Sequence, residues 1–170
     1  DIQEPEPHTI KDISVDTTTP QLRPFQMEGW KRIEELNGRV LLADEPGLGK
    51  TCQSLMYLKN HPELRPAIII CPATLKINWA NEMKKWGIEE KYKIINGTKV
   101  WSIDEEIVIV NYDVLDNYMV LLESLQPKLI ISDEIHKIMN ISAKRTRAFK
   151  YLVKGVDHII AISGTPITSR

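Results

Sequence analysis

The feature of this sequence that most constrains its fold is a series of short segments that are apolar at successive positions. Examples are AIII at 67–70, IVIV at 107–110 and LIIS at 129–132. A strand with one solvated face alternates apolar and polar residues, whereas a strand that is apolar throughout is covered on both faces. Segments with the apolar spacing of amphipathic helices separate these runs. The pattern predicts an α/β fold, a three-layer sandwich in which helices cover both faces of a mainly parallel sheet.

The alternation also predicts where the individual elements lie. Strands are expected at 40–43, 67–70, 92–95, 107–110, 129–132 and 158–163. A basic helix is expected over 142–154. Four further helices are expected, each around one set of apolar residues. The sets are Met27, Trp30 and Ile33; Cys52, Leu55 and Met56; Leu75, Trp79, Met83 and Trp86; and Val114, Leu115, Tyr118, Leu122 and Leu125. Ligands of parallel sheets bind beyond the carboxyl ends of the strands, so motifs that directly follow a strand indicate a binding site.

Length favours a single domain. A chain of 170 residues has room for one domain with a full core and hardly for two. We expect a flexible or edge lead-in over 1–20, which is rich in proline, threonine and acidic residues, and the domain proper over 21–170. Because the chain begins at Asp1 rather than methionine, we also expect it to be a piece of a longer protein.

Composition excludes several classes of protein. Apolar residues at 42% and charged residues at 26% are ordinary for a globular domain. No apolar run approaches the ~20 residues that a membrane-spanning helix needs. The net charge of −1 provides no overall basic field, so a nucleic acid would have to be bound by a local patch. Cys52 and Cys71 lie inside apolar segments, and we expect reduced core residues in an intracellular protein.

A glycine-rich loop lies between a predicted strand and a predicted helix. The segment LLADEPGLGKT at 41–51 ends in the Gly-x-Gly-Lys-Thr of a phosphate-binding loop. In this setting backbone N–H groups and the helix N-terminus surround a phosphate, and Gly47 and Gly49 permit its close approach. Lys50 can reach the β- and γ-phosphates of ATP, and the Thr51 hydroxyl can bind Mg²⁺. The alternative is a glycine turn that only caps a helix, but the strand–loop–helix setting favours an ATP loop.

A pair of carboxylates follows another predicted strand. LIISDEIHK at 129–137 places Asp133 and Glu134 directly after the apolar run. Asp133 is the candidate ligand of Mg²⁺, shared with Thr51 and the phosphates, and Glu134 is the candidate base or orienting group for the attacking water. An Asp-Glu pair can also be a solvated turn that caps a helix. His136 is either a hydrogen-bonded structural histidine or a link from the γ-phosphate site to the next motif.

Six motifs follow one another along the chain: LRPFQMEGW (22–30), DEPGLGKT (44–51), CPATLKINWANEMKKW (71–86), IVNYDVL (109–115), DEIHKIMN (133–140) and SGTPITSR (163–170). Together they resemble the first RecA-like lobe of the Swi/Snf family, whose members are superfamily 2 helicase-like ATPases that depend on double-stranded DNA. The resemblance covers roughly residues 20–170, and the closing SGTPITSR favours the annealing-helicase branch. An Asp is common in that family at the position of Asp44, whereas Pro46 replaces the usual methionine and Ile135 replaces the alanine of a DEAH-type box.

The resemblance implies a role for each matching residue. Gln26 would read the adenine, with Arg23 nearby. Phosphate and metal would be contacted by Gly47, Gly49, Lys50, Thr51 and Asp133, and catalysis would be carried out by Lys50, Asp133 and Glu134. Coupling of hydrolysis to DNA movement would involve His136, Ser163, Gly164 and Thr165. The DNA-facing segment would contain Pro72, Thr74, Lys76, Asn78 and Trp79. Within that segment we place Thr74, Lys76 and Asn78 on the rim, where a DNA backbone could lie, and Trp79 in the core.

The resemblance further implies ATP hydrolysis coupled to movement on double-stranded DNA, with remodelling or annealing of the DNA. It implies a second RecA-like lobe whose arginines complete the site, so we expect this chain alone to hydrolyse ATP very slowly. Two alternatives stay open. A DExH-type RNA helicase lobe shares the nucleotide chemistry, and a non-enzymatic nucleotide-binding module would serve as a switch or scaffold, although the intact Lys50, Thr51, Asp133 and Glu134 argue against it.

Overall fold

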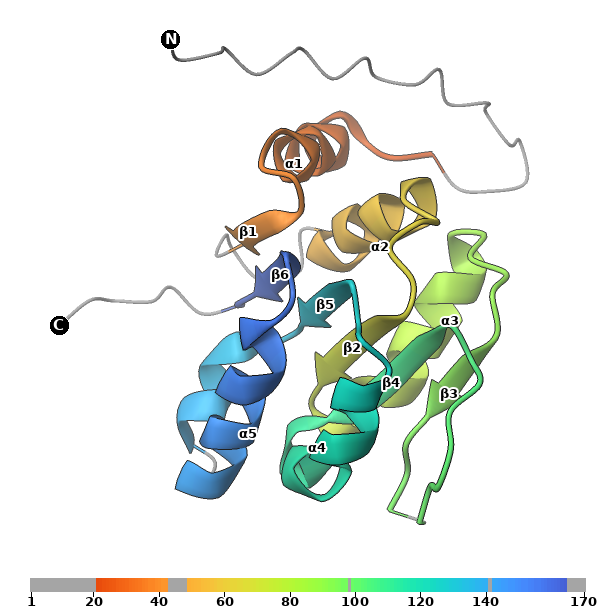
Figure 1. Cartoon of the computed structure of the whole chain (residues 1–170). Coiled ribbons are helices and arrows are strands. Elements are labelled where there is room, and N and C mark those ends of the chain that lie inside the picture. Colours follow the sequence, from red (N-terminus) through yellow and green to blue (C-terminus); the bar gives the residue numbers. More distant parts are fainter. Residues whose placement is uncertain (1–20, 43–48, 98, 141, 165–170) are drawn as a thin grey trace, which may run out of the picture.

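One parallel sheet carries this fold. The computed structural model describes residues 21–42, 49–97, 99–140 and 142–164, so the predicted lead-in over 1–20 lies outside the described residues. Six strands are hydrogen-bonded in the order β1-β6-β5-β2-β4-β3, and every pair is parallel (Figure 1). All six predicted strands are confirmed: β1 (Arg39–Leu42), β2 (Ala67–Cys71), β3 (Tyr92–Ile94), β4 (Ile107–Asn111), β5 (Leu129–Ser132) and β6 (His158–Ile162).

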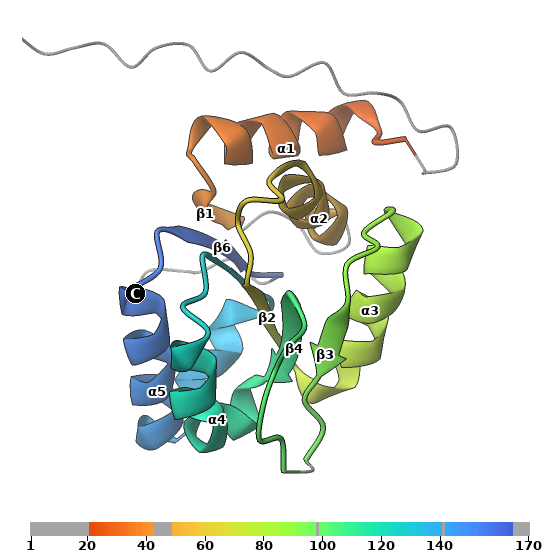
Figure 2. The ribbon, with the colours of Figure 1, turned by 45° about the vertical axis from the view of Figure 1, so that its right-hand side comes forward.

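Helices cover both faces of the sheet. The three helices α1 (Pro24–Glu35), α2 (Lys50–Asn60) and α3 (Lys76–Lys85) pack on one face, and α4 (Leu115–Ser124) and α5 (Ala143–Lys154) pack on the other (Figure 2). Short 3-10 helices follow three of the strands: η1 (Ala73–Leu75), η2 (Tyr112–Val114) and η3 (Ile135–Asn140). The predicted three-layer α/β sandwich is therefore confirmed.

The core consists of two layers that meet at the sheet. Strand β2 is buried at all five positions, as its continuous apolar sequence predicts. Its side chains alternate between the layers, so that Ile69 and Cys71 pack with α1, α2 and α3, whereas Ile68 and Ile70 pack with α4 and α5. Each face of the central strand therefore needs its own cover of helices.

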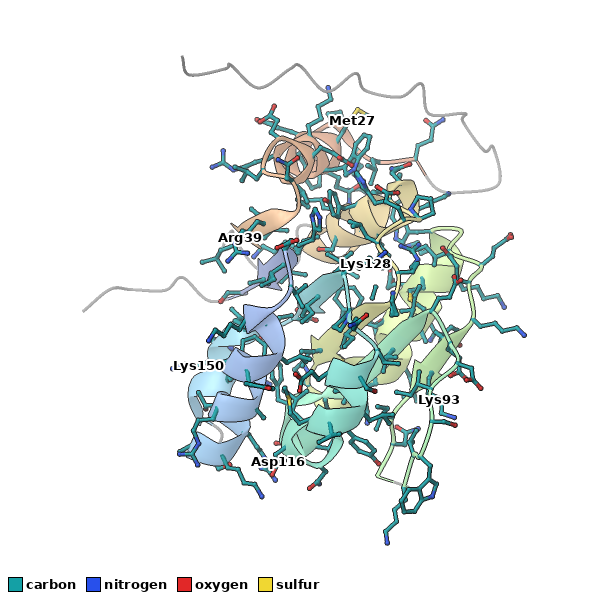
Figure 3. All side chains as sticks on the ribbon, in the orientation of Figure 1. Met27, Arg39, Lys93, Asp116, Lys128 and Lys150 are labelled. Atoms are coloured by element: carbon teal, nitrogen blue, oxygen red, sulfur yellow. The ribbon has the colours of Figure 1, made fainter. Side chains whose placement is uncertain are left out.

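The predicted helical faces are confirmed with one exception. Trp79, Met83 and Trp86 are buried on α3, whereas Met27 on α1 is 40% exposed and lies on the outer side of its helix (Figure 3). Each three-residue step falls roughly 60° short of a full turn of ~3.6 residues, so the two steps from Met27 to Ile33 add up to a rotation of roughly 120°. The buried face of α1 is centred on Trp30 and Ile33.

The burial of the two cysteines and the lengths of the helices agree with the expectations from the composition. Cys52 and Cys71 are buried free thiols, as predicted. Burial disfavours the thiolate and raises the pKa of Cys52 to about 11 and that of Cys71 to about 12, so neither thiol is activated. Among the described residues, no helix has the length and apolar character needed to cross a membrane.

Truncation of a side chain in the central strand tests the two-layer core. Ile69→Ala should lower the free energy of unfolding by about 2–5 kcal/mol, because it leaves a cavity between fully buried neighbours. The matched variant Val120→Ala removes a β-branched side chain that is 84% exposed on α4, and should change stability by less than about 0.5 kcal/mol. Urea unfolding followed by circular dichroism measures both, and a similar small effect for the two would contradict the packing described here.

Candidate nucleotide-binding site

The strand order brings the carboxyl ends of three strands that precede sequence motifs to one edge of the sheet. Strand β6 lies between β1 and β5, so the ends of these three strands are neighbours although they are far apart in sequence. Two backbone bonds lie just beyond the strand ends: Ser163 N–H donates to the Leu42 carbonyl of β1 (2.9 Å), and Asp133 N–H donates to the Ile70 carbonyl of β2 (2.7 Å). The predicted location of the site at the carboxyl edge is thereby built into the topology.

Helix α2 begins at this edge. Its N-cap is Gly49, whose φ of +79° is unfavourable for residues with a side chain. The first turn carries Lys50 and Thr51, and its N–H groups together with the helix dipole favour an anion at this end. Gly47, which the sequence also assigned to the phosphate loop, lies outside the described residues.

Lys50 connects the phosphate loop to the last strand. Its side chain is buried, and its ammonium donates to the main-chain carbonyl of Ser163 at 2.8 Å, across 113 residues of sequence. The hydroxyl of Ser54, one turn later, donates to the Lys50 carbonyl (2.9 Å). The ammonium is therefore held at the carboxyl edge of the sheet, beside the N-terminus of α2.

The glutamine predicted to read adenine lies against the same glycine. Gln26 Oε1 accepts from the main-chain N–H of Arg23 (2.9 Å), which closes the start of α1. A Cβ at Gly49 would lie 2.5 Å from Gln26 Nε2, so the glycine is needed for this contact as well as for its backbone angle. The structure thus brings Gln26 to Gly49 at the start of α2, with the exposed Arg23 one helical turn before it.

A charged cluster holds α1 on α2. Glu34 on α1 accepts from the Trp30 indole (3.0 Å) and contacts His61 Nε2 at 2.7 Å, while the other ring nitrogen of His61 contacts Glu63 at 2.9 Å. The His61 ring also lies 4.2 Å from that of Tyr57. The hydrogen bond with Glu34 is the largest cause of a raised His61 pKa, opposed by burial and supported by Glu63. Protonated His61 therefore strengthens the junction that positions Gln26.

Asp133 is held in the interior by two aromatic residues. Its side chain is buried, and its Oδ2 accepts from the Trp79 indole N–H at 2.8 Å. The Tyr112 hydroxyl donates to the Asp133 carbonyl (2.6 Å) and lies 2.6 Å from the Ser132 hydroxyl. Burial raises the pKa of Asp133, whereas the Trp79 bond favours the ionised form. Sequence reasoning assigned Trp79 to the core, which is confirmed, but missed both aromatic contacts.

Glu134 adopts an unusual backbone conformation. Its φ is +52°, the left-handed region, which costs a residue with a side chain about 1–3 kcal/mol. Its Oε2 lies 3.2 Å from His136 Nε2, and His136 Nδ1 lies 3.3 Å from the Ser163 hydroxyl. A Cβ at Gly164 would approach Glu134 Oε1 to 3.0 Å. The side chains of these residues thus form one chain of contacts, which the Ser163 carbonyl extends to Lys50.

This chain of contacts brings together the residues that the sequence assigned to catalysis and coupling. Glu134, His136, Ser163 and Gly164 meet at one place, while Thr165 lies outside the described residues. His136 stands between the acidic pair and the segment after β6. Its role as a link between them stays a prediction.

The predicted DNA-facing segment divides into two parts. Thr74 in η1 and Asn78 in α3 are exposed, and Pro72 is partly exposed. Lys76 differs from the expectation, because its side chain is buried and its ammonium donates to the Ile95 carbonyl (2.9 Å) and to Asn111 Oδ1 (3.2 Å). The segments at the ends of β3 and β4 place these two acceptors within reach of the Lys76 ammonium. The sequence alone does not reveal these contacts.

Basic residues on α5 lie on the other face of the sheet. Arg145 contacts Asp113 and Asp116 at 3.7 Å each, and Lys144 contacts Asp116 at 3.6 Å. These ion pairs join α5 to α4 and the turn before it. They lie on the side opposite to α2 and α3 (Figure 1).

A parallel sheet with a helix that begins at Gly49, Lys50 and Thr51, an acidic pair after β5 and a Ser-Gly segment after β6 defines a RecA-like lobe. The chain belongs to the SNF2-related domain family, whose model matches residues 29–170. This confirms the resemblance to the Swi/Snf family.

Individual relatives support the same assignment. An uncharacterized ATP-dependent helicase of Mycoplasma pneumoniae is 39% identical over 163 residues, and the human DNA annealing helicase and endonuclease ZRANB3 is 30% identical over 174 residues. The matches cover 88% and 97% of this chain but only 16% of either relative. The SWI2/SNF2 ATPase core of Sulfolobus solfataricus in complex with double-stranded DNA superimposes with a TM-score of 0.73 at 32% identity, covering 88% of this chain and 33% of that one.

The His61 cluster predicts a specific dependence of stability on pH. Because the folded-state pKa of His61 is raised above 6.5, the stabilisation is fully present below the unfolded pKa and is lost as pH rises through the folded pKa. His61→Gln should therefore lower the free energy of unfolding most at about pH 5.5 and least at about pH 9. Urea unfolding of both proteins across this range measures the difference, with Glu34→Gln expected to weaken the same dependence because Glu63 still contacts the ring. Parallel curves for wild type and His61→Gln would exclude this role.

Proposed function

We propose that this chain is the ATP-binding lobe of a double-stranded-DNA translocase, which couples ATP hydrolysis to movement on DNA and to remodelling or annealing of the DNA. The observation that carries the proposal is the convergence of Lys50, the acidic pair and Ser163 at one edge of the sheet. Membership of the SNF2-related family supports it, as do relatives described as an annealing helicase and as an ATPase core bound to double-stranded DNA.

In this proposal the first turn of α2 binds the phosphates of ATP. Lys50 supplies a positive charge to the β- and γ-phosphates, and the N–H groups after Gly49 supply donors. The position of Lys50 in the first turn of α2, with its ammonium held at the carboxyl edge by the Ser163 carbonyl, favours this role. Gln26 contacts the adenine from the start of α1, which its packing against Gly49 supports.

The acidic pair has the chemistry expected for a metal and a water molecule. The described residues contain no cluster of three or more His, Cys, Asp or Glu side chains able to hold a metal, and we propose that phosphate oxygens and water complete the metal site. Asp133 and the Thr51 hydroxyl offer the hard oxygen ligands that Mg²⁺ prefers. Mg²⁺ bound there would neutralise charge on the phosphates during transfer. Glu134 accepts a proton from the attacking water or orients it, and His136 fixes the Glu134 carboxylate.

The DNA backbone is proposed to lie along η1 and the start of α3. Thr74 and Asn78 are exposed there and can donate hydrogen bonds to phosphate oxygens. Contacts to phosphate carry little sequence information, so we propose little sequence specificity. Lys76 contributes by holding this segment to β4 rather than by reaching the backbone directly, since its ammonium is bonded to Ile95 and Asn111.

A second RecA-like lobe is proposed to complete the catalytic site. Phosphoryl transfer needs positive charge beyond that of Lys50 and Mg²⁺, and a missing arginine finger costs about 10³–10⁵ in rate in related NTPases. Arg145 is paired with Asp113 and Asp116 on the far face of the sheet, so it is not a substitute. We therefore expect slow ATP turnover, with little stimulation by DNA, from residues 1–170 alone.

Binding of ATP tests the phosphate loop directly. Lys50→Ala should weaken binding of a fluorescent ATP analogue with Mg²⁺ by about 10–100-fold, the cost of removing a charge-assisted hydrogen bond. Lys59→Ala, at the last turn of the same helix, is the matched control and should bind like wild type. Equal affinity of wild type and Lys50→Ala would rule out this loop as the phosphate site.

Hydrolysis and its nucleic-acid dependence separate the remaining alternatives. In the longer protein with both lobes, Glu134→Gln should still bind ATP but turn it over about 10²–10⁴-fold more slowly, because a general base is lost. The exposed Glu89→Gln serves as control. Steady-state turnover should rise with duplex DNA. Stimulation by RNA instead would favour the RNA helicase alternative, and no hydrolysis by the wild type under any condition would favour the non-enzymatic module.

A further inference from the structure

The hydrogen bond between Trp79 and Asp133 joins two segments that the proposed function treats separately. Trp79 lies in the first turn of α3, directly after the proposed DNA-facing residues, and Asp133 follows β5. The indole Nε1 donates to Asp133 Oδ2 at 2.8 Å across 54 residues of sequence. Trp79 is fully buried and Asp133 is 7% exposed, so solvent competes little with this bond.

The second tryptophan of α3 shows why this bond is unusual. Trp86 is also buried, and its indole donates to a carboxylate, that of Glu82, at 3.1 Å. That bond is local, because Glu82 lies four residues earlier on the same helix. Buried tryptophans generally find a partner for their N–H, and Trp86 shows that α3 can satisfy one without leaving the helix. The partner of Trp79 is instead the proposed metal ligand.

The main chain of Asp133 is already fixed without Trp79. Its N–H donates to the Ile70 carbonyl at 2.7 Å, and its carbonyl accepts from the Tyr112 hydroxyl at 2.6 Å. The remaining freedom of this residue is rotation of the carboxylate about its side-chain bonds. The indole N–H restricts that rotation, because it binds one of the two carboxylate oxygens.

We propose that Trp79 is a positioning residue for Asp133: its indole N–H holds Oδ2 and so directs the other carboxylate oxygen to Mg²⁺. The inference rests on the proposed function of Asp133 as a metal ligand. Partners that orient a metal ligand typically change metal affinity by about 10–100-fold when they are removed.

The Mg²⁺ dependence of nucleotide binding tests this proposal. Trp79→Phe keeps an aromatic ring in the core and removes only the N–H and part of the ring system. Trp86→Phe is the matched control on the same helix and the same buried face. A fluorescent ATP analogue is titrated with each protein in EDTA and at increasing Mg²⁺. Trp79→Phe should require about 10-fold more Mg²⁺ than wild type for half of the metal-dependent gain in affinity, with unchanged affinity in EDTA, whereas Trp86→Phe should match wild type.

An NMR readout on the wild-type protein keeps the test independent of how the variant folds. The sequence has four tryptophans, and their indole N–H resonances can be assigned from the single variants at positions 30, 79, 86 and 101 or by elimination. The Trp79 resonance should shift when Mg²⁺ is added to the nucleotide-bound protein, and the Trp86 resonance should not. Urea unfolding checks that Trp79→Phe retains a cooperative fold.

The outcomes separate this inference from the proposed function. If wild type requires Mg²⁺ but Trp79→Phe and Trp86→Phe have the same requirement, or if the Trp79 resonance ignores the metal, Trp79 only fills the core and the inference fails alone. If wild type binds the nucleotide with no dependence on Mg²⁺, the metal role of Asp133 fails and takes the inference with it. A raised Mg²⁺ requirement confined to Trp79→Phe supports both.

Discussion

Strand β2 is hydrogen-bonded along both edges and buried on both faces, and the rest of the structure follows from that constraint. Two buried faces require helices on both sides, because each apolar face must be covered. Parallel neighbours must be joined by crossover connections. Because every strand runs in the same direction, the carboxyl ends share one edge. That edge gathers Asn111, Asp133 and Ser163 from strands that are distant in sequence. The site is thus a consequence of how the core is covered.

At this edge the polar residues contact one another in a continuous series rather than in isolated pairs. Lys50 reaches the backbone of Ser163, whose hydroxyl meets His136, which meets Glu134. A change at any member therefore alters the surroundings of the next, since the polar groups share partners in a partly dry environment. The left-handed backbone of Glu134 fits this view, because strain of that kind persists only where neighbours determine the conformation.

The sequence predicts the fold and the membership of the site better than the contacts within it. Continuous apolar strands and glycine at position 49 have few physical alternatives, so the six strands and the start of α2 could be predicted. The partners of Trp79 and Lys76 could not, because periodicity shows only which side of a helix is apolar. Whether a buried lysine finds a carbonyl, or an indole finds a carboxylate, depends on distances across the sheet. Met27 was assigned wrongly for a related reason, since spacing does not reveal how wide a buried face is.

The pairing of β1 has a consequence for the order in which this molecule can assemble. Among the described residues its one neighbour in the sheet is β6, so β1 finds its partner more than a hundred residues later in the sequence. During synthesis β1 must wait for β6 to emerge, while β2 and β4 can pair earlier. Contacts of such long sequence separation form late, because closing a long loop costs chain entropy before any bond is gained. The edge of the sheet where β1 and β6 meet is thus completed after β2 and β4 have paired, and a chain that has not yet reached β6 holds central strands without that edge.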